Sequence, residues 1–146
     1  MRLLIPILAG ALLLGGCQPA QVRVDGAWIR LPAVAGRPGA AYFHIRGGDQ
    51  TATVVGVATP LADRAELHES MAGGGGMMTM APLAKVDVPP RADIAFAPAG
   101  RHVMLFGLSP AAKAGGTGRL SVRFADGRTI STEARILAAG DPAPTG

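Results

Sequence analysis

The stretch Arg119–Ile136, which reads RLSVRFADGRTISTEARI, decides the fold class. Apolar and polar residues alternate on both sides of the turn Ala125–Gly127, and two alternating runs around an Asp-Gly turn are typical of a β-hairpin. Because side chains point to opposite faces along a strand, Leu120, Val122 and Phe124 share one face. The stretch therefore predicts two antiparallel strands with one buried face.

Similar short segments, most of them ended by Gly or Pro, fill the chain before this hairpin. They cover residues 27–31, 40–46, 51–58, 64–69, 83–88, 93–96 and 103–108. No convincing amphipathic helix separates them. Short strands at regular spacing over about 115 residues predict a single-domain, all-β fold, either an antiparallel β-sandwich or a barrel.

The composition excludes several other classes of protein. The 146 residues carry 14 Lys and Arg against 10 Asp and Glu, and 49% of them are apolar, which argues against a disordered chain. The 21 Gly and 12 Pro disfavour a helical bundle. The basic residues are spread singly and aromatic residues make up 4% of the chain, so we expect no nucleic-acid partner.

The N-terminus has the features of an export signal. The apolar run 3–14 is shorter than the ~20 residues that a membrane-spanning helix needs, and it is typical of a signal peptide. The sequence Leu14–Cys17, LGGC, resembles a lipobox. We therefore predict a lipoprotein signal peptide over residues 1–16, with Cys17 as the lipidated first mature residue. Cleavage after Ala20 is the alternative, and both place the protein outside the cytoplasm.

The mature chain divides into three predicted parts. Residues 17–24 form a tether, 25–137 the β-sandwich domain and 138–146 a flexible tail. A lipid on Cys17 would attach the domain to a membrane surface. Cys17 is also the only cysteine, so the domain has no intrachain disulfide.

Methionines cluster beside two of the three histidines. His68 is followed within 12 residues by four methionines, and a fifth follows two residues after His102: Met71, Met77, Met78, Met80 and Met104. Thioether sulfur is a soft ligand that selects Cu(I), and imidazole also suits copper. Free thiolates oxidise outside the cytoplasm, so a site of His and Met without Cys is a reasonable way to hold Cu(I) there.

The spacing selects four candidate ligands. His102 and Met104 are two residues apart, so on a strand they point to the same face. His68 and Met80 flank a Gly-rich loop, and closure of a hairpin would bring them together. We predict that these four residues bind one Cu(I) ion.

The remaining histidine and three methionines are not among the four predicted ligands. His44 lies in a predicted strand without a His or Met neighbour, so we interpret it as structural. Met71, Met77 and Met78 are interpreted as residues of a partly exposed loop, and whether they contribute to the metal site stays open.

The combined pattern resembles that of the PCu(A)C family of periplasmic copper chaperones. Its members share a His, about ten residues, a Met, 21 residues and then His-x-Met; here 21 residues separate Met80 from His102. The segments Ala65–Glu69 and His102–Leu108 match the surroundings of the family's two histidines, and the resemblance covers roughly residues 25–136. One extra residue precedes Met80, and the run Gly73–Gly76 is the expected place for it.

The resemblance implies a cupredoxin-like β-sandwich with a Cu(I) site near solvent. It also implies a periplasmic protein that delivers copper to a copper-accepting partner, such as the binuclear copper centre of a cytochrome c oxidase subunit or another copper chaperone. We expect a monomer. The tail 138–146 contains neither His nor Met, which gives no support for a second copper site.

Other functions stay open or are disfavoured. A copper sequestration or tolerance protein would use the same ligands, and a metal-free interaction lipoprotein is a further alternative. A blue-copper electron carrier needs a Cys ligand with two His, and Cys17 lies in the leader. No nucleophile, acid and base pattern frames the histidines, so we expect no enzyme and no catalytic residues.

Overall fold

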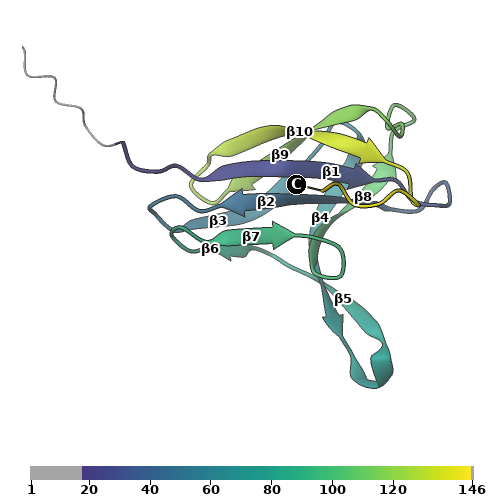
Figure 1. The fold of residues 1–146 in the computed structure, drawn as a ribbon, viewed down its shortest axis with the longest axis horizontal. Helices are drawn as coiled ribbons and strands as arrows, with labels where there is room; N and C mark the ends of the chain where they lie inside the picture. The colour runs from purple at the N-terminus through teal and green to yellow at the C-terminus, as the bar shows by residue number, and fades with distance from the viewer. Residues whose placement is uncertain (1–17, 146) are drawn as a thin grey trace, which may run out of the picture.

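The computed structural model describes residues 18–145, and within them it confirms the predicted all-β fold (Figure 1). The ten strands are β1 Arg23–Arg30, β2 Gly39–Arg46, β3 Ala52–Ala58, β4 Ala62–Ala72, β5 Met78–Pro82, β6 Val86–Val88, β7 Asp93–Phe96, β8 Arg101–Leu108, β9 Thr117–Phe124 and β10 Thr129–Leu137. One 3₁₀ turn, η1 Gly74–Gly76, joins β4 to β5. Over the same residues, no helix has the length and apolar character to span a membrane.

All ten strands belong to one sheet in the order β5-β4-β8-β7-β2-β1-β10-β9-β3-β6, and β8 also pairs directly with β2. The sheet curls so that β3 contacts β4 without pairing with it. Most pairings are antiparallel as expected, but β1–β10 and β7–β8 are parallel. Strands β1 and β10 lie far apart in the sequence, so no local signal indicates their direction. A short turn over residues 97–100 joins β7 to β8, and these two strands pair only at Phe96 and Arg101.

The core lies on the inner face of the curled sheet. Its largest fully buried side chains are Ile29, Phe43, Ile45, Val54, Val88, Phe96, Val103, Leu105, Leu120, Val122 and Ile136. Most of them alternate with exposed or partly exposed residues, but Trp28, Tyr42 and His102, which precede Ile29, Phe43 and Val103, are buried as well. The rings of Phe43 and Phe96 stack with centroids 4.4 Å apart between β2 and β7. The predicted final hairpin is confirmed, since β9 and β10 pair throughout and the turn contains Gly127 at a φ of 88°.

The strand boundaries differ from the sequence-based expectations mainly around the methionines. The segment 64–69 extends to an 11-residue β4, while only Val86–Val88 of the segment 83–88 forms a strand. Strand β5 is not among the strands expected from the sequence, because MTMAP contains one β-branched residue and no clear alternation. The extended β4 and the additional strand β5 form a hairpin that projects from the body of the molecule (Figure 1).

Both ends of the described chain pack against the sheet. Val22 and Val24 are buried, and the carbonyl of Ala20 accepts a hydrogen bond from the backbone N–H of Asp49, so packing extends into the segment expected as a tether. In the segment expected as a free tail, the carbonyl of Asp141 accepts a 3.0 Å hydrogen bond from Arg30. The predicted signal peptide and the predicted lipidation site at Cys17 lie outside the described residues.

Candidate metal centre

Two histidines face each other across neighbouring strands. In the β4–β8 pairing His68 lies opposite His102 and Glu66 lies opposite Met104. The two imidazole ring centroids are 6.0 Å apart. Because directly opposed residues point to the same side of a sheet, and residues two apart share a face, all four side chains lie on one face. The predicted common face of His102 and Met104 is thus present.

The β4–β5 hairpin adds Met80 to the same face. Met80 lies opposite Ser70, and His68 lies opposite Pro82. Met80 is therefore a diagonal neighbour of His68, at a position about 7–8 Å away between Cα atoms. Closure of the hairpin does bring His68 and Met80 onto one surface, with Ser70 rather than His68 as the direct partner of Met80.

The four side chains range from buried to exposed. His102 has 5% of its surface exposed, and the side chain of His68 has 16%. Met104 is partly exposed, whereas Met80 on the projecting hairpin is 58% exposed. The nitrogen donors are thus less exposed than the outermost sulfur donor, which is open to solvent.

Each of these two histidines forms one hydrogen bond within the described chain. Nδ1 of His102 lies 2.9 Å from the carbonyl oxygen of Gly100. Nε2 of His68 lies 3.1 Å from Oε2 of Glu66, and Nδ1 of His68 is buried without a hydrogen-bond partner among residues 18–145. The other oxygen of Glu66, Oε1, lies 2.8 Å from Nε of Arg64.

Glu66 is a member of this cluster that the sequence analysis did not identify. Its hydrogen bond with His68, together with the positive charge of Arg64, holds the pKa of the Glu66 carboxyl below its usual range. The available signal was its position two residues before His68, which on a strand puts both side chains on the same face.

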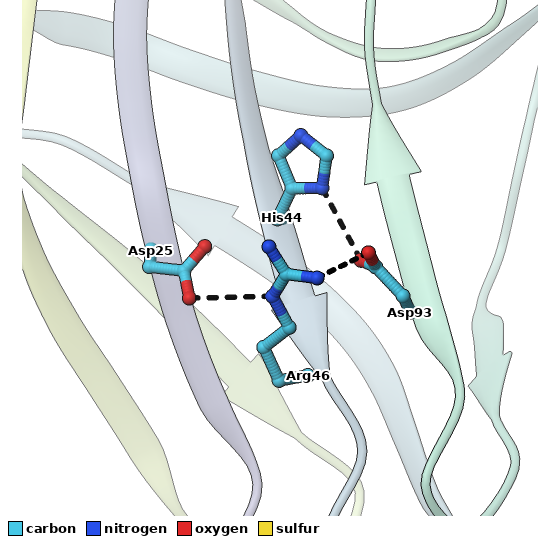
Figure 2. A network of polar contacts seen from close by, with 4 residues as sticks. All are labelled: Asp25, His44, Arg46 and Asp93. Carbon is cyan, nitrogen blue, oxygen red and sulfur yellow. Dashed lines mark hydrogen bonds and ion pairs between the residues drawn. The ribbon is translucent and has the colours of Figure 1, made fainter. Parts of the chain in front are cut away.

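The third histidine, His44, belongs to a separate surface network. Nδ1 of His44 lies 3.2 Å from Oδ1 of Asp93. Arg46 lies between Asp25 and Asp93 and forms ion pairs with both, joining β1, β2 and β7 (Figure 2). All four of these residues are substantially exposed, and the network contains no thioether.

The other methionines divide between the two sides of the hairpin. Met78 lies two residues before Met80 on β5 and shares its face. Met71 is offset from this face by one residue on β4, so it points the opposite way, and Met77 lies in the turn with 70% exposure. Met78 therefore lies on the same face as the candidate centre, and Met71 lies on the opposite face.

The chemistry of the donors on this face suits a soft cation. Two imidazoles and two thioethers are all neutral donors, and thioether sulfur selects Cu(I). Within residues 18–145, no group of three or more His, Cys, Asp or Glu side chains is arranged to hold a metal ion. The described donors thus favour a soft, monovalent ion over zinc, which proteins bind through Cys, His and carboxylate.

The chain matches one family model over most of its length and one related protein. The family model "Putative lipoprotein LpqE-like" matches residues 22–136. A protein of Leifsonia xyli subsp. xyli, named "Putative lipoprotein Lxx21020", is 31% identical over 115 residues, which are 78% of this chain and 68% of that protein.

Solved structures with the same fold include apo-DR1885 from Deinococcus radiodurans, which is 30% identical to this chain. Its alignment has a TM-score of 0.61 and covers 97% of this chain and 96% of that one. CuI-DR1885 is 31% identical with a TM-score of 0.61, covering 84% and 81%. The copper-bound PCuAC domain from PmoF2 has a TM-score of 0.67 at 19% identity, covering 84% and 97%. The cupredoxin-like architecture expected from the sequence is confirmed.

Proposed function

The chain belongs to the LpqE-like family of lipoproteins and has the fold of PCuAC domains, and from this premise we propose that it is an extracytoplasmic copper chaperone. It binds one Cu(I) ion through the imidazoles of His68 and His102 and the thioethers of Met80 and Met104. One observation carries the proposal: three neighbouring strands put these four neutral, soft or borderline donors on a single face.

A relative supports the choice of ion. The related D. radiodurans protein, 31% identical to this chain, has been solved in solution as CuI-DR1885. Methionine sulfur and histidine nitrogen in this chain offer the donor types that Cu(I) prefers.

The difference in exposure between the donors suits a carrier. The imidazoles of buried His102 and partly buried His68 lie on paired strands of the sheet, so they give the ion a fixed position. Met80, which is 58% exposed, is the donor that an approaching protein reaches first. A soft ligand of the partner replaces Met80 at the ion, and the remaining donors are then exchanged in turn.

Delivery is the finer part of the proposal. The acceptor is a copper-binding protein outside the cytoplasm, such as a cytochrome c oxidase subunit or another copper chaperone, and the lipid on Cys17 keeps the carrier at the membrane surface of the periplasm. Transfer of Cu(I) to a purified acceptor distinguishes this role from sequestration, in which the ion stays bound while an equal concentration of acceptor is present.

A competition titration tests the copper site. The domain is titrated with Cu(I) under reducing conditions against a chromophoric Cu(I) chelator. We expect one ion per chain, with strong loss of affinity in His102→Ala and no loss in His44→Ala, whose imidazole lies in the separate network of Figure 2. Equal weakening by both substitutions, or no binding by the unaltered domain, would contradict the proposal.

A further inference from the structure

The two facing histidines have hydrogen bonds on different ring nitrogens. A carboxylate only accepts hydrogen bonds, and Oε1 of Glu66 already forms an ion pair with Nε of Arg64 at 2.8 Å. Nε2 of His68, 3.1 Å from Oε2 of Glu66, therefore carries the proton in the neutral ring. Nδ1 of His68 is left with a lone pair, and it is buried with no hydrogen-bond partner in the described part of the chain.

His102 has the opposite arrangement. The carbonyl oxygen of Gly100 also only accepts, so Nδ1 of His102, 2.9 Å away, carries the proton of that ring. Its Nε2 then has the lone pair. The 6.0 Å between the ring centroids leaves the two unprotonated nitrogens on neighbouring side chains of one face.

Glu66 is itself held in place along the same strand face. Its Oε1 lies 2.8 Å from Nε of Arg64, and the guanidinium of Arg64 lies over the ring of Phe106 at 4.4 Å from its centroid. Phe106 is the direct cross-strand partner of Arg64. Both carboxylate oxygens of Glu66 are thus engaged, one by Arg64 and one by His68.

We propose that Glu66 is a positioning residue that fixes His68 in its Nε2–H tautomer, so that Cu(I) is bound by Nδ1 of His68 and by Nε2 of His102. This inference rests on the proposed copper site and specifies which atom of each ring binds the ion. A buried acceptor without a partner is costly, and a bound ion satisfies it. Histidines that ligate metals usually donate their other N–H to a carboxylate or a carbonyl, as both rings do here.

Glu66 acts through His68 rather than as a ligand. Carboxylate oxygen is a hard donor that suits Mg²⁺ or Ca²⁺ better than Cu(I), and ligation would require it to release Arg64 or His68. The carboxylate instead fixes the tautomer of the imidazole and keeps the ring oriented.

The first test measures the tautomers without copper. Long-range proton–nitrogen NMR spectra of histidine-labelled, copper-free protein distinguish the protonated ring nitrogen, with the His68 signals identified from their loss in His68→Gln. We expect Nε2–H for His68 and Nδ1–H for His102. After Cu(I) loading, Nδ1 of His68 and Nε2 of His102 should shift most. An Nδ1–H tautomer for His68 in the copper-free protein, or a shift at its Nε2 instead, would overturn the inference.

The second test removes the carboxylate. In Glu66→Leu we expect a mixture of His68 tautomers and Cu(I) binding that is about 10- to 100-fold weaker, the usual range for the loss of such a partner. Glu66→Gln keeps an acceptor oxygen, so it should restore the Nε2–H tautomer and most of the affinity. Glu69→Gln is the matched control, because Glu69 pairs with Arg101 and is offset from this face by one residue.

Two results of the second test would contradict the role of Glu66. An unchanged tautomer and affinity in Glu66→Leu would show that the carboxylate does not position His68. Loss in Glu66→Gln as complete as in His68→Gln would make Glu66 a ligand. The tautomers are measured without copper, so failure of the proposed function, seen as absence of Cu(I) binding, is distinguishable from failure of this inference.

Discussion

At the scale of single residues, Met80 is the proposed ligand that lies between the histidines and the solvent. It lies on the projecting β4–β5 hairpin, one pleat from His68, and it is the most exposed of the four proposed ligands. Its neighbour Met78 shares the same face but lies one pleat farther from the histidines. The structure thus gives the two thioethers different distances from the same centre.

This difference leads to a prediction about the methionines. Met80→Ala should weaken Cu(I) binding by at least about tenfold, a loss no smaller than that caused by altering a ligand's outer partner. Met78→Ala should lose little, and the double variant should be weaker than Met80→Ala alone, because Met78 substitutes in part. Met71→Ala is the control, since Met71 points away from this face. Competition titrations measure all four, and equal losses for Met78→Ala and Met80→Ala would refute the assignment.

Tyr42 gives a prediction about pH. Burial, opposed by the positive charge of Arg30, raises the pKa of the Tyr42 phenol above its usual value of about 10. The folded protein therefore holds this proton more tightly than the unfolded chain does. The resulting stabilisation is fully present below the unfolded pKa, and it is lost as the pH rises through the folded pKa.

Because Tyr42 is the only tyrosine, ultraviolet absorbance of tyrosinate measures its titration directly. We expect the midpoint of the folded protein to lie above that of the protein unfolded in urea. A folded midpoint equal to or below the unfolded one would show that the phenol is not buried against Trp28, with which it stacks at 4.3 Å.

Residue spacing predicted part of the candidate site. His102 and Met104 follow from a separation of two on one strand, a purely local rule. Glu66 was missed because a carboxylate is not a ligand expected for a soft metal ion. Its hydrogen bond with His68 becomes visible only in the structure. That His68 lies directly opposite His102 depends on the register of β4 against β8. The spacing of the motif along the chain does not predict this register.

At the scale of strands and hairpins, the contrast between two hairpins explains what the sequence could predict. In the β9–β10 hairpin, alternation and an Asp-Gly turn agree, and the structure has both strands as expected. In the β4–β5 hairpin, the run of glycines gives no turn type and β5 has little β-propensity. Strand β5 is formed by pairing with β4, so its existence depends on a neighbour rather than on its own residues.

The turn of the β9–β10 hairpin gives a prediction about stability. Gly127 has a φ of 88°, in the left-handed region, where a Cβ atom costs about 1–2 kcal/mol. Gly127→Ala should lower the free energy of unfolding by about this amount. Gly140→Ala is the control, since Gly140 has no positive φ and an added Cβ would meet no atom of the described chain within 4 Å.

Urea denaturation with tryptophan fluorescence measures both glycine variants. Trp28 is the only tryptophan and is 7% exposed, so it reports unfolding of the sheet. Similar stabilities for the two variants would show that the turn does not need the left-handed conformation.

At the scale of the whole molecule, the core and the candidate centre occupy opposite faces of the same strands. On β4 and β8, Leu67 and Val103 are paired and buried in the core, while the adjacent His68 and His102 are paired on the other face. The direction of the β1–β10 pair, by contrast, was not predictable, because these two strands are joined only through the rest of the chain. Packing of the core fixes the strands, and the strands in turn fix the donors.

The core gives a prediction about global stability. Phe43 is 1% exposed and stacks on Phe96, so Phe43→Ala should reduce the free energy of unfolding by about 3–5 kcal/mol. Val34→Ala, at a residue that is 64% exposed, should change it by less than about 0.5 kcal/mol. Denaturant titrations compare the two, and a loss of under about 1 kcal/mol for Phe43→Ala would contradict the assignment of the core.

The central claim is that one Cu(I) ion is held by two imidazoles and two thioethers on the face shared by β4, β5 and β8. X-ray absorption at the copper edge of the Cu(I)-loaded protein tests it most directly. We expect two nitrogen and two sulfur neighbours of the copper ion, with one sulfur lost in Met80→Ala and one nitrogen lost in His102→Ala. A copper environment without sulfur, or one unchanged by both substitutions, would contradict it.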